Sequence, residues 1–219
     1  MSLSIVVPVL NEAPRIRTHL AALAPLRGQG VEVVVVDGGS GDGTAELAGG
    51  LCDRVLSAPR GRARQMNAGA RAANGGHLLF LHADTQLPAG AAALVARALE
   101  ARAWGRFDVA IESTHPLLRL VAAAMNLRSR LTGIATGDQA IFVRREAFDG
   151  FPEIPLMEDV AFSAAMRRKG PPACLRERVV TSARRWESRG VLATIVLMWR
   201  IRLAYALGAD PARLAERYR

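Results

Sequence analysis

Lysine is almost missing from this chain of 219 residues, since Lys169 is its only copy. The net charge of +9 and the isoelectric point near 11.1 therefore come almost wholly from arginine. A positive excess suits contact with anions such as nucleic acid, an acidic membrane face or a phosphorylated substrate. The arginines are also scattered among many alanines, a pattern that a GC-rich coding bias produces, so both interpretations stay open.

Cysteine is nearly as scarce, and Cys52 and Cys174 stand far apart with no C-x-x-C pair and no histidine cluster beside either. This spacing argues against a zinc site and a disulfide framework, and it predicts two buried thiols in a reducing compartment. No basic segment or cleavage site stands between Met1 and the mostly apolar residues 3–7. We therefore expect no signal peptide and a cytoplasmic protein.

Two kinds of segment are also lacking. No loop of the G-x-G-x-x-G or G-x-x-x-x-G-K-[ST] type follows the first apolar run, which disfavours a dinucleotide-binding or P-loop enzyme. The most apolar stretch, residues 190–208, is interrupted by Arg200 and Arg202, which makes a membrane span costly. We expect a C-terminal helix there, either packed on the protein or lying at a membrane surface with both guanidinium groups in water.

What is present is an alternation of short apolar runs and amphipathic stretches at the spacing of βα units. This pattern predicts an α/β fold with a mainly parallel sheet covered by helices on both faces. The expected strands are residues 3–7, 31–36, 54–56, 77–81, 107–111 and 140–143. The expected helices are residues 13–26, 62–73, 89–103, 116–130 and 160–169.

Polar clusters follow the first two expected strands, at residues 8–12 and 37–44. Ligands of open α/β sheets bind beyond the carboxyl ends of the strands, so these clusters are candidate binding loops. We expect the Asp37 carboxylate to contact a ligand, by accepting hydrogen bonds from a base or a ribose. For Asp42 and Thr44 we favour a structural role in a turn and a helix cap.

Three later clusters carry candidate chemistry. His82-Ala83-Asp84 ends the fourth expected strand, where Asp84 could hold a hard divalent cation that bridges two phosphates. Taken alone, such a pattern is more commonly a turn with a helix cap. Gly137-Asp138-Gln139 precedes a strand, and Glu158-Asp159 opens a helix. One of these carboxylates could deprotonate a hydroxyl, or Asp159 could simply cap its helix; spacing alone does not decide.

In this order, the segments resemble the family 2 glycosyltransferases of the GT-A fold, and the likeness extends to about Trp186. Residues 8–12 resemble the family's P-x-x-N-E, residues 35–44 its V-V-D-D-G-S-x-D-x-T, and residues 64–69 its A-R-N-x-G. His82-Ala83-Asp84 stands at its D-x-D, Glu158-Asp159 at its E-D pair, and Arg185-Trp186 at the end of its Q-x-x-R-W.

The chain also departs from the pattern. Gly38 and His82 each stand where the family has an aspartate, Met66 interrupts the arginine motif, and Ser182 stands where glutamine would be. Metal binding is weakened, because Asp84 alone supplies a carboxylate at the D-x-D position. The sequence is further similar to a small bacterial branch associated with arsenosugar or selenodomain pathways.

The resemblance implies a GT-A domain with a Rossmann-like sheet over residues 1–188 and a C-terminal helical extension over residues 189–219, packed or in peripheral contact with a membrane. It implies an inverting transfer from a nucleotide-diphosphate sugar to an unidentified hydroxyl acceptor, with Asp159 as base beside Glu158 and with Asp84 holding Mg²⁺ or Mn²⁺. The residues expected to bind the nucleotide sugar are Pro8, Leu10, Asn11, Glu12, Asp37, Gly38, Arg60, Arg62, Arg64, Asn67, His82 and Ala83. Those expected on the acceptor side are Gly137, Asp138, Gln139, Arg185 and Trp186.

Two other functions are compatible with parts of the sequence. A nucleotidyltransferase has a similar fold but usually carries a glycine-rich, arginine-containing loop after its first strand, where this chain has residues 8–12. A non-catalytic basic module bound to a membrane or a nucleic acid would explain the arginine excess and residues 190–208. For the glycosyltransferase we expect no nucleic-acid partner.

Overall fold

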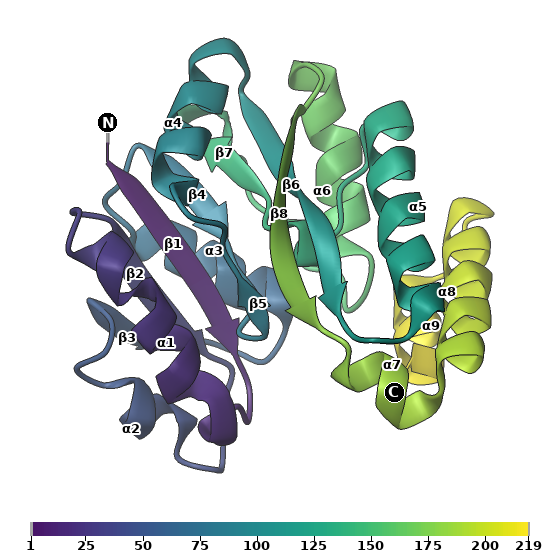
Figure 1. Cartoon of the computed structure of the whole chain (residues 1–219), viewed down its shortest axis with the longest axis horizontal. Helices are drawn as coiled ribbons and strands as arrows, with labels where there is room; N and C mark the ends of the chain where they lie inside the picture. Colours follow the sequence, from purple (N-terminus) through teal and green to yellow (C-terminus); the bar gives the residue numbers. More distant parts are fainter. Residues whose placement is uncertain (1, 219) are drawn as a thin grey trace.

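The computed structural model describes residues 2–218, which form an eight-stranded sheet in the order β3-β2-β1-β4-β7-β6-β8-β5 (Figure 1). The strands are β1 (Leu3–Val9), β2 (Glu32–Asp37), β3 (Arg54–Ser57), β4 (His77–Phe80), β5 (Thr85–Gln86), β6 (Trp104–Glu112), β7 (Phe142–Arg144) and β8 (Ala173–Ser182). The helices are α1 (Ala13–Arg27), α2 (Thr44–Ala48), α3 (Arg62–Ala72), α4 (Ala91–Ala101), α5 (Pro116–Thr132), α6 (Glu158–Met166), α7 (Arg184–Arg189), α8 (Val191–Ala206) and α9 (Pro211–Tyr218).

The first four strands of the order, β3, β2, β1 and β4, are all parallel. Beyond them β7 is antiparallel to both β4 and β6, whereas β8 runs parallel to β6 and antiparallel to β5. The predicted α/β class is confirmed, and the C-terminal part of the sheet is mixed. The carboxyl ends of the parallel strands lie along one edge, where the loops of the site begin.

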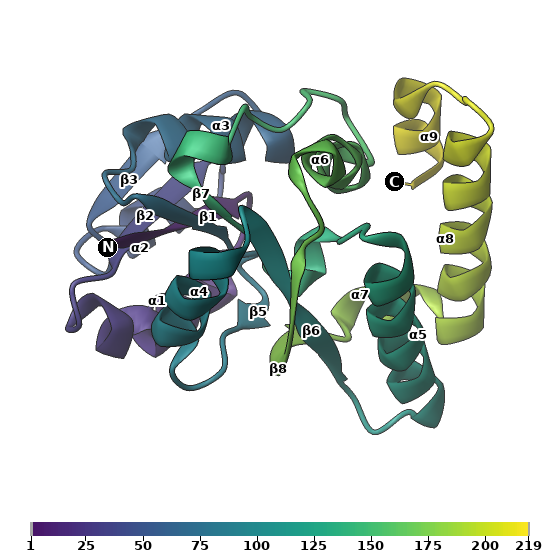
Figure 2. The same cartoon turned by 90° about the horizontal axis from the view of Figure 1, so that it is seen from above.

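Helices cover both faces of the sheet, α1 and α4 on one side and α3 and α6 on the other (Figure 2). Alternate residues of β1 explain this, because a strand points successive side chains to opposite faces. Ile5 and Val7 pack in the core with Leu20 of α1 and Leu99 of α4. Val6 packs with residues of α3 and α6 on the other face.

Helix α3 approaches the sheet closely through Gly69. A Cβ at this position would lie 2.4 Å from Cγ1 of Val6 and 2.9 Å from Cγ2 of Val36. The helix can rest on β1 and β2 only because the residue has no side chain. Its first residue, Arg62, is thereby held at the edge of the sheet where the strands end.

The largest difference from the sequence prediction is β8, a ten-residue strand that we did not expect. Its middle residues Arg176, Glu177 and Arg178 are exposed and charged, which interrupts the apolar alternation typical of a strand. The predicted strand over residues 140–143 begins only at Phe142, because Ala140 has a φ of 45°. Cys52 is a buried free thiol as expected, whereas Cys174 is only half-buried.

The chain ends in two helices at the far side from α1 and α2, of which α8 lies beside α5 (Figures 1 and 2). Four large apolar side chains of α8 and one directly after it are exposed, namely Leu192, Val196, Trp199, Leu203 and Leu207. Their spacing places them along one stripe of the helix. Among residues 2–218, no helix combines the length and the hydropathy that a membrane span needs.

Candidate functional site

Two cavities adjoin at the carboxyl ends of the strands. The strand-end cavity, of about 420 Å³, is lined by residues that include Pro8, Leu10, Glu12, Arg60, Ala83 and Asp84. The helical cavity, of about 570 Å³, is lined by residues of α5, α8 and the start of α6, including Glu158 and Asp159. Five residues line both cavities: Arg62, His82, Asp138, Arg185 and Trp186.

The wall of the strand-end cavity is set by hydrogen bonds between the two predicted binding loops. The backbone N–H of Glu12 donates to Oγ1 of Thr44 at 2.8 Å, and that of Ala13 donates to the Asp42 carboxylate at 3.0 Å. Asp42 thus accepts from the first residue of α1, whose N–H has no partner within the helix. Thr44 and Asp42 are structural, as we expected.

The Asp37 side chain stabilises the second of these loops, residues 37–44. Its carboxylate accepts hydrogen bonds from the backbone of Gly39 and Ser40, both at 2.9 Å, and from the Ser40 hydroxyl at 2.5 Å. Asp37 is not among the residues that line either cavity. Contact between Asp37 and a ligand remains a prediction.

Gln65 is a site residue that sequence reasoning missed. Its amide donates to the carbonyl oxygens of Val9 and Val36, both at 2.8 Å, and so joins the ends of β1 and β2. A Cβ at Gly38 would lie 3.0 Å from three atoms of this amide. Gly38, which stands where the family has an aspartate, therefore leaves the space that the buried amide of Gln65 occupies.

His82 stands where the two cavities meet. Its Nδ1 lies 3.3 Å from Oδ1 of Asp138, which brings together two segments that are 56 residues apart in the sequence. Burial acts to raise the pKa of Asp138, but the hydrogen bond to His82 and the charges of His82, Arg62 and Arg185 outweigh it and lower that pKa. Asp138 is thus held as a carboxylate among cations.

Asp159 lines the helical cavity, and its carboxylate is fixed by two backbone donors. Oδ2 accepts from Gly137 at 2.9 Å and Oδ1 from Val160 at 2.7 Å. Burial raises the pKa of Asp159 despite these two hydrogen bonds, and the charge of Asp138 raises it further. Burial and the charge of Asp159 likewise raise the pKa of the neighbouring Glu158. A carboxylate of raised pKa is a stronger base than an ordinary one.

The backbone is strained at three places around these cavities. Asn11, Ala140 and Met157 have φ values of 53°, 45° and 69°, and Met157 directly precedes Glu158. Such left-handed conformations cost of order 1–3 kcal/mol each for a residue other than glycine, and they persist where the surroundings enforce them. Their concentration beside the predicted loops supports a functional role for this end of the sheet.

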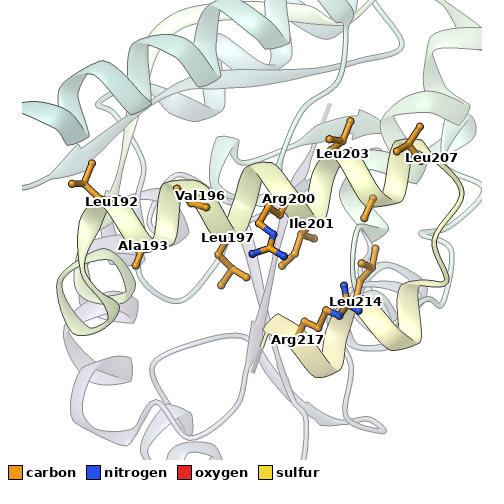
Figure 3. A pocket seen from close by; sticks show the side chains of 11 residues that line it. Leu192, Ala193, Val196, Leu197, Arg200, Ile201, Leu203, Leu207, Leu214 and Arg217 are labelled. Atoms are coloured by element: carbon orange, nitrogen blue, oxygen red, sulfur yellow. The ribbon is translucent and has the colours of Figure 1, made fainter.

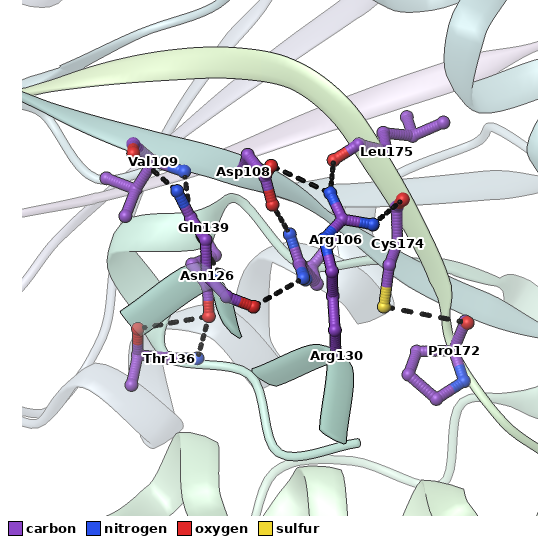
Figure 4. Close-up of polar contacts among 10 residues, drawn as sticks. All are labelled: Arg106, Asp108, Val109, Asn126, Arg130, Thr136, Gln139, Pro172, Cys174 and Leu175. Atoms are coloured by element: carbon purple, nitrogen blue, oxygen red, sulfur yellow. Dashed lines mark hydrogen bonds and ion pairs between the residues drawn. The ribbon is translucent and has the colours of Figure 1, made fainter. Parts of the chain in front are cut away.

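A polar network behind the site holds the Gly137–Gln139 turn (Figure 4). Buried Gln139 accepts a hydrogen bond from the Thr136 backbone at 3.2 Å and donates to Asn126 at 3.4 Å. Beside it, Asp108 forms ion pairs with Arg106 and Arg130. Gln139, which we predicted on the acceptor side, therefore stabilises the turn through these hydrogen bonds and lines neither cavity.

Besides Asp37, four residues predicted to bind the nucleotide sugar lie outside the lining of both cavities, namely Asn11, Gly38, Arg64 and Asn67. Asn11 accepts a hydrogen bond from Gly41, and buried Asn67 exchanges two hydrogen bonds with the backbone of Phe151. Arg64 is half-exposed and forms an ion pair with Glu153 at 3.5 Å. Their binding roles stay untested predictions.

The donor set at the predicted metal position is small. Among residues 2–218, no group of three or more His, Cys, Asp or Glu side chains could hold a metal ion. Asp84 nevertheless faces the strand-end cavity, and Mg²⁺ commonly binds through one or two carboxylates together with substrate phosphates and water. The residues present therefore fit a cation that arrives with a diphosphate and do not fit a cage made by the protein alone.

A third cavity, of about 870 Å³, lies between α8 and α9 (Figure 3). Its lining is apolar except for Arg200 and Arg217, and it includes no carboxylate. The side chains in Figure 3 come from these two helices and from Leu207, which follows α8. We therefore place the candidate site in the two adjoining cavities.

Comparison with solved structures identifies similar folds. S. aureus TarS 1–349 in complex with UDP has a TM-score of 0.67 at 20% identity, with 83% of this chain and 60% of that chain covered. The mannosyltransferase PcManGT from Pyrobaculum calidifontis, in complex with GDP-Man and Mn²⁺, has a TM-score of 0.66 at 22% identity, with 99% and 68% covered. Glucosyl-3-phosphoglycerate synthase from Mycobacterium tuberculosis, in complex with Mn²⁺, UDP and glucosyl-3-phosphoglycerate, has a TM-score of 0.58 at 20% identity, with 82% and 70% covered.

At these identities the likeness shows the fold, and the chain spans less than two thirds of the TarS structure. No curated protein matches the chain by sequence. The family profile described as "Glycosyl transferase family 2" does match, over residues 4–151, which is more than half of the chain. The chain therefore belongs to glycosyl transferase family 2 and has the fold of the GT-A glycosyltransferases.

Proposed function

We propose that this protein transfers a sugar from a nucleotide-diphosphate sugar to a hydroxyl acceptor with inversion at the anomeric carbon. The observation that carries the proposal is the position of Asp159, which lines the helical cavity close to the five residues shared with the strand-end cavity. A donor in the strand-end cavity and an acceptor in the helical cavity would meet at this junction.

Asp159 is the proposed base. The acceptor oxygen forms a bond to the anomeric carbon while the bond from that carbon to the diphosphate oxygen breaks, with its electron pair leaving on the diphosphate. The acceptor proton passes to Asp159, whose raised pKa suits this transfer. Attack from the face opposite the leaving group inverts the anomeric centre.

The diphosphate lies, in this proposal, beside Arg60, Arg62 and Asp84, which line the strand-end cavity. Asp84 would hold Mg²⁺ or Mn²⁺, and a bound cation offsets the charge that develops on the leaving diphosphate. The arginines supply positive charge from the protein itself and bind oxyanions through several N–H groups. Pro8, Leu10 and Glu12 would contact the nucleoside.

The test is turnover with a panel of nucleotide sugars, scored as hydrolysis and as transfer. We expect one donor class to be consumed, and Asp159→Asn to lower kcat by at least about a hundredfold, the scale of one acid–base group. Asp149→Asn is the matched control, because Asp149 is exposed and paired with Lys169. Full turnover by Asp159→Asn would exclude it as base. Formation of a nucleotide sugar from a sugar phosphate and a nucleoside triphosphate would instead establish a nucleotidyltransferase.

We also propose peripheral contact with a membrane through residues 190–208. The stripe of four exposed apolar residues on α8, continued by Leu207, supports it, since an apolar patch of this kind is costly in water. In vesicle flotation, the protein should bind vesicles containing anionic lipid, and Trp199→Glu should weaken that binding. Equal flotation of both proteins would contradict the contact. We also keep as proposals from the sequence that the GT-A domain ends at residue 188 and that the chain belongs to the arsenosugar-associated branch.

A further inference from the structure

Arg128 presents an unexplained cation to the helical cavity. It lines that cavity from α5, and its Nε and Nη2 atoms are buried without a hydrogen-bond partner among residues 2–218. Buried guanidinium groups are normally paired, because an ionised group removed from water without a partner is strongly destabilised. The arrangement is therefore incomplete without a further acceptor of hydrogen bonds.

Asp159, whose negative charge acts on Arg128, does not complete it. No ion pair joins the two residues within 4.0 Å, and the Asp159 carboxylate already accepts from Gly137 and Val160. The charge of Asp159 does favour the protonated form of Arg128, but burial outweighs it and lowers the pKa of Arg128. Even so, an arginine keeps its charge at neutral pH.

Away from the charged residues at the junction and from Glu158, Asp159 and Arg202, the walls of the helical cavity are largely apolar. Its walls include Val121, Ala124 and Met125 from α5, Leu156 and Met157 from the segment before α6, and Ile195, Met198, Trp199 and Leu203 from α8. Trp199 and Leu203 also belong to the exposed stripe of α8, with 74% and 63% of their surface accessible. The apolar wall therefore continues from the cavity onto the outer face of the protein.

We propose that the acceptor is an amphiphile whose anionic group binds Arg128 and whose apolar part lies along the walls from α5 and α8. A guanidinium group presents a planar fork of donors that matches two oxygens of a phosphate or carboxylate. Nε and Nη2 are shielded from solvent, so the Arg128 side chain, which lines the cavity, would have to turn its fork toward the bound anion to satisfy both atoms. The apolar part gains from leaving water. The role of the amphiphile as acceptor rests on the proposed function. The binding site for the amphiphile does not depend on that function.

Calorimetry with three probes separates the two halves of the proposed ligand. Decyl phosphate should bind more tightly than decanol, which lacks the anion, and more tightly than inorganic phosphate, which lacks the chain. In Arg128→Met, the affinity for decyl phosphate should fall about tenfold or more, to that for decanol, because the charge-assisted hydrogen bonds are gone. Arg128→Lys should retain part of the affinity, since it keeps the charge without the fork.

Arg119→Gln is the matched control, because Arg119 is an exposed arginine of the same helix and does not line the cavity. It should change the affinity less than about twofold. Arg128→Met should also unfold at the same temperature or higher, since neither Nε nor Nη2 loses a partner. Equal affinity of the unchanged protein for decyl phosphate and decanol, or unchanged affinity in Arg128→Met, would overturn the proposal.

Binding of UDP and GDP, measured in the same proteins, distinguishes this inference from the proposed function. If a nucleotide diphosphate binds and decyl phosphate shows no preference, the acceptor inference fails and the transferase proposal stands. If decyl phosphate binds through Arg128 and no nucleotide or nucleotide sugar is bound or consumed, the site stands and the transferase proposal fails.

Discussion

The imidazole ring of His82 lies directly against Gly137, so closely that a Cβ at position 137 would be 2.4 Å from Cε1 and 2.5 Å from Nε2 of the ring. The same histidine contacts Asp138 through Nδ1. Gly137 in turn donates its N–H to Asp159. One glycine thus connects the residue at the D-x-D position to the proposed base, across the junction of the two cavities.

We predict that Gly137→Ala lowers turnover at least about tenfold while the protein stays folded. The added methyl group must displace the ring of His82 or the turn that carries Asp138, and an error of about 1 Å in a reacting group can cost a hundredfold in rate. The measurement is kcat with the donor identified in the panel, together with circular dichroism.

Gly76→Ala is the control for that substitution. Nothing lies within 4 Å of a Cβ at this exposed position, and its φ is not in the left-handed region. It should leave turnover within about twofold. If Gly137→Ala were as active as Gly76→Ala, the contact between His82 and Gly137 would have no part in positioning the site.

A second prediction concerns the pH dependence of kcat/KM. The base works when deprotonated, so turnover should fall as the pH drops through the pKa of Asp159, which lies above its ordinary value because of burial and the charge of Asp138. Asp138→Asn removes that negative charge and should move the acidic limb of the profile to lower pH. Asp149→Asn should not move it. An acidic limb that stays in place in Asp138→Asn would argue against Asp159 as the titrating base.

The strands and the loops at their ends were predictable because buried parallel strands leave continuous apolar runs bounded by polar residues. The antiparallel β7 and the charged β8 were harder to predict, since their pairing depends on partners far away in the sequence. Pro8, Glu12, Asp84, Asp138 and Asp159 were all singled out from the sequence and line the two cavities.

The residues that the sequence could not reveal act through contacts with distant segments. Gln65 joins two strand ends, Arg128 is one of many arginines, and Arg184 pairs with Glu12 across 172 positions of sequence at 3.1 Å. None of them differs in its local pattern from an ordinary helix residue. Only the packing of α3, α5 and α7 around the sheet gives them a role.

A third prediction concerns stability. Burial and the charge of Asp159 raise the pKa of Glu158 above its ordinary value of 4.5, so the folded protein binds this proton more tightly than the unfolded chain does. The ionised group therefore destabilises the protein at neutral pH, and this cost disappears as the pH falls below 4.5. Glu158→Gln should raise Tm at pH 7, by about 2–4 °C for each kcal/mol recovered, and the gain should shrink at acid pH.

Thermal unfolding at both pH values checks this. Glu153→Gln is the control, because Glu153 is half-exposed and its ion pair with Arg64 spans 3.5 Å at the surface, where such pairs contribute little. Its Tm should stay close to that of the unchanged protein at both pH values. A lower Tm of Glu158→Gln at pH 7 would mean that the carboxylate has a stabilising partner.

The last prediction separates a metal held by the protein from one that arrives with the donor. Because Asp84 is the carboxylate at the D-x-D position and no group of three ligands exists among residues 2–218, Mn²⁺ alone should bind weakly. With UDP present, phosphate oxygens complete the coordination, so each ligand should tighten the binding of the other by the same factor. Calorimetry of Mn²⁺ with and without UDP measures this coupling, and Asp84→Ala should abolish it while leaving metal-free UDP binding in place. Tight binding of Mn²⁺ without UDP, or coupling that survives Asp84→Ala, would place the cation elsewhere.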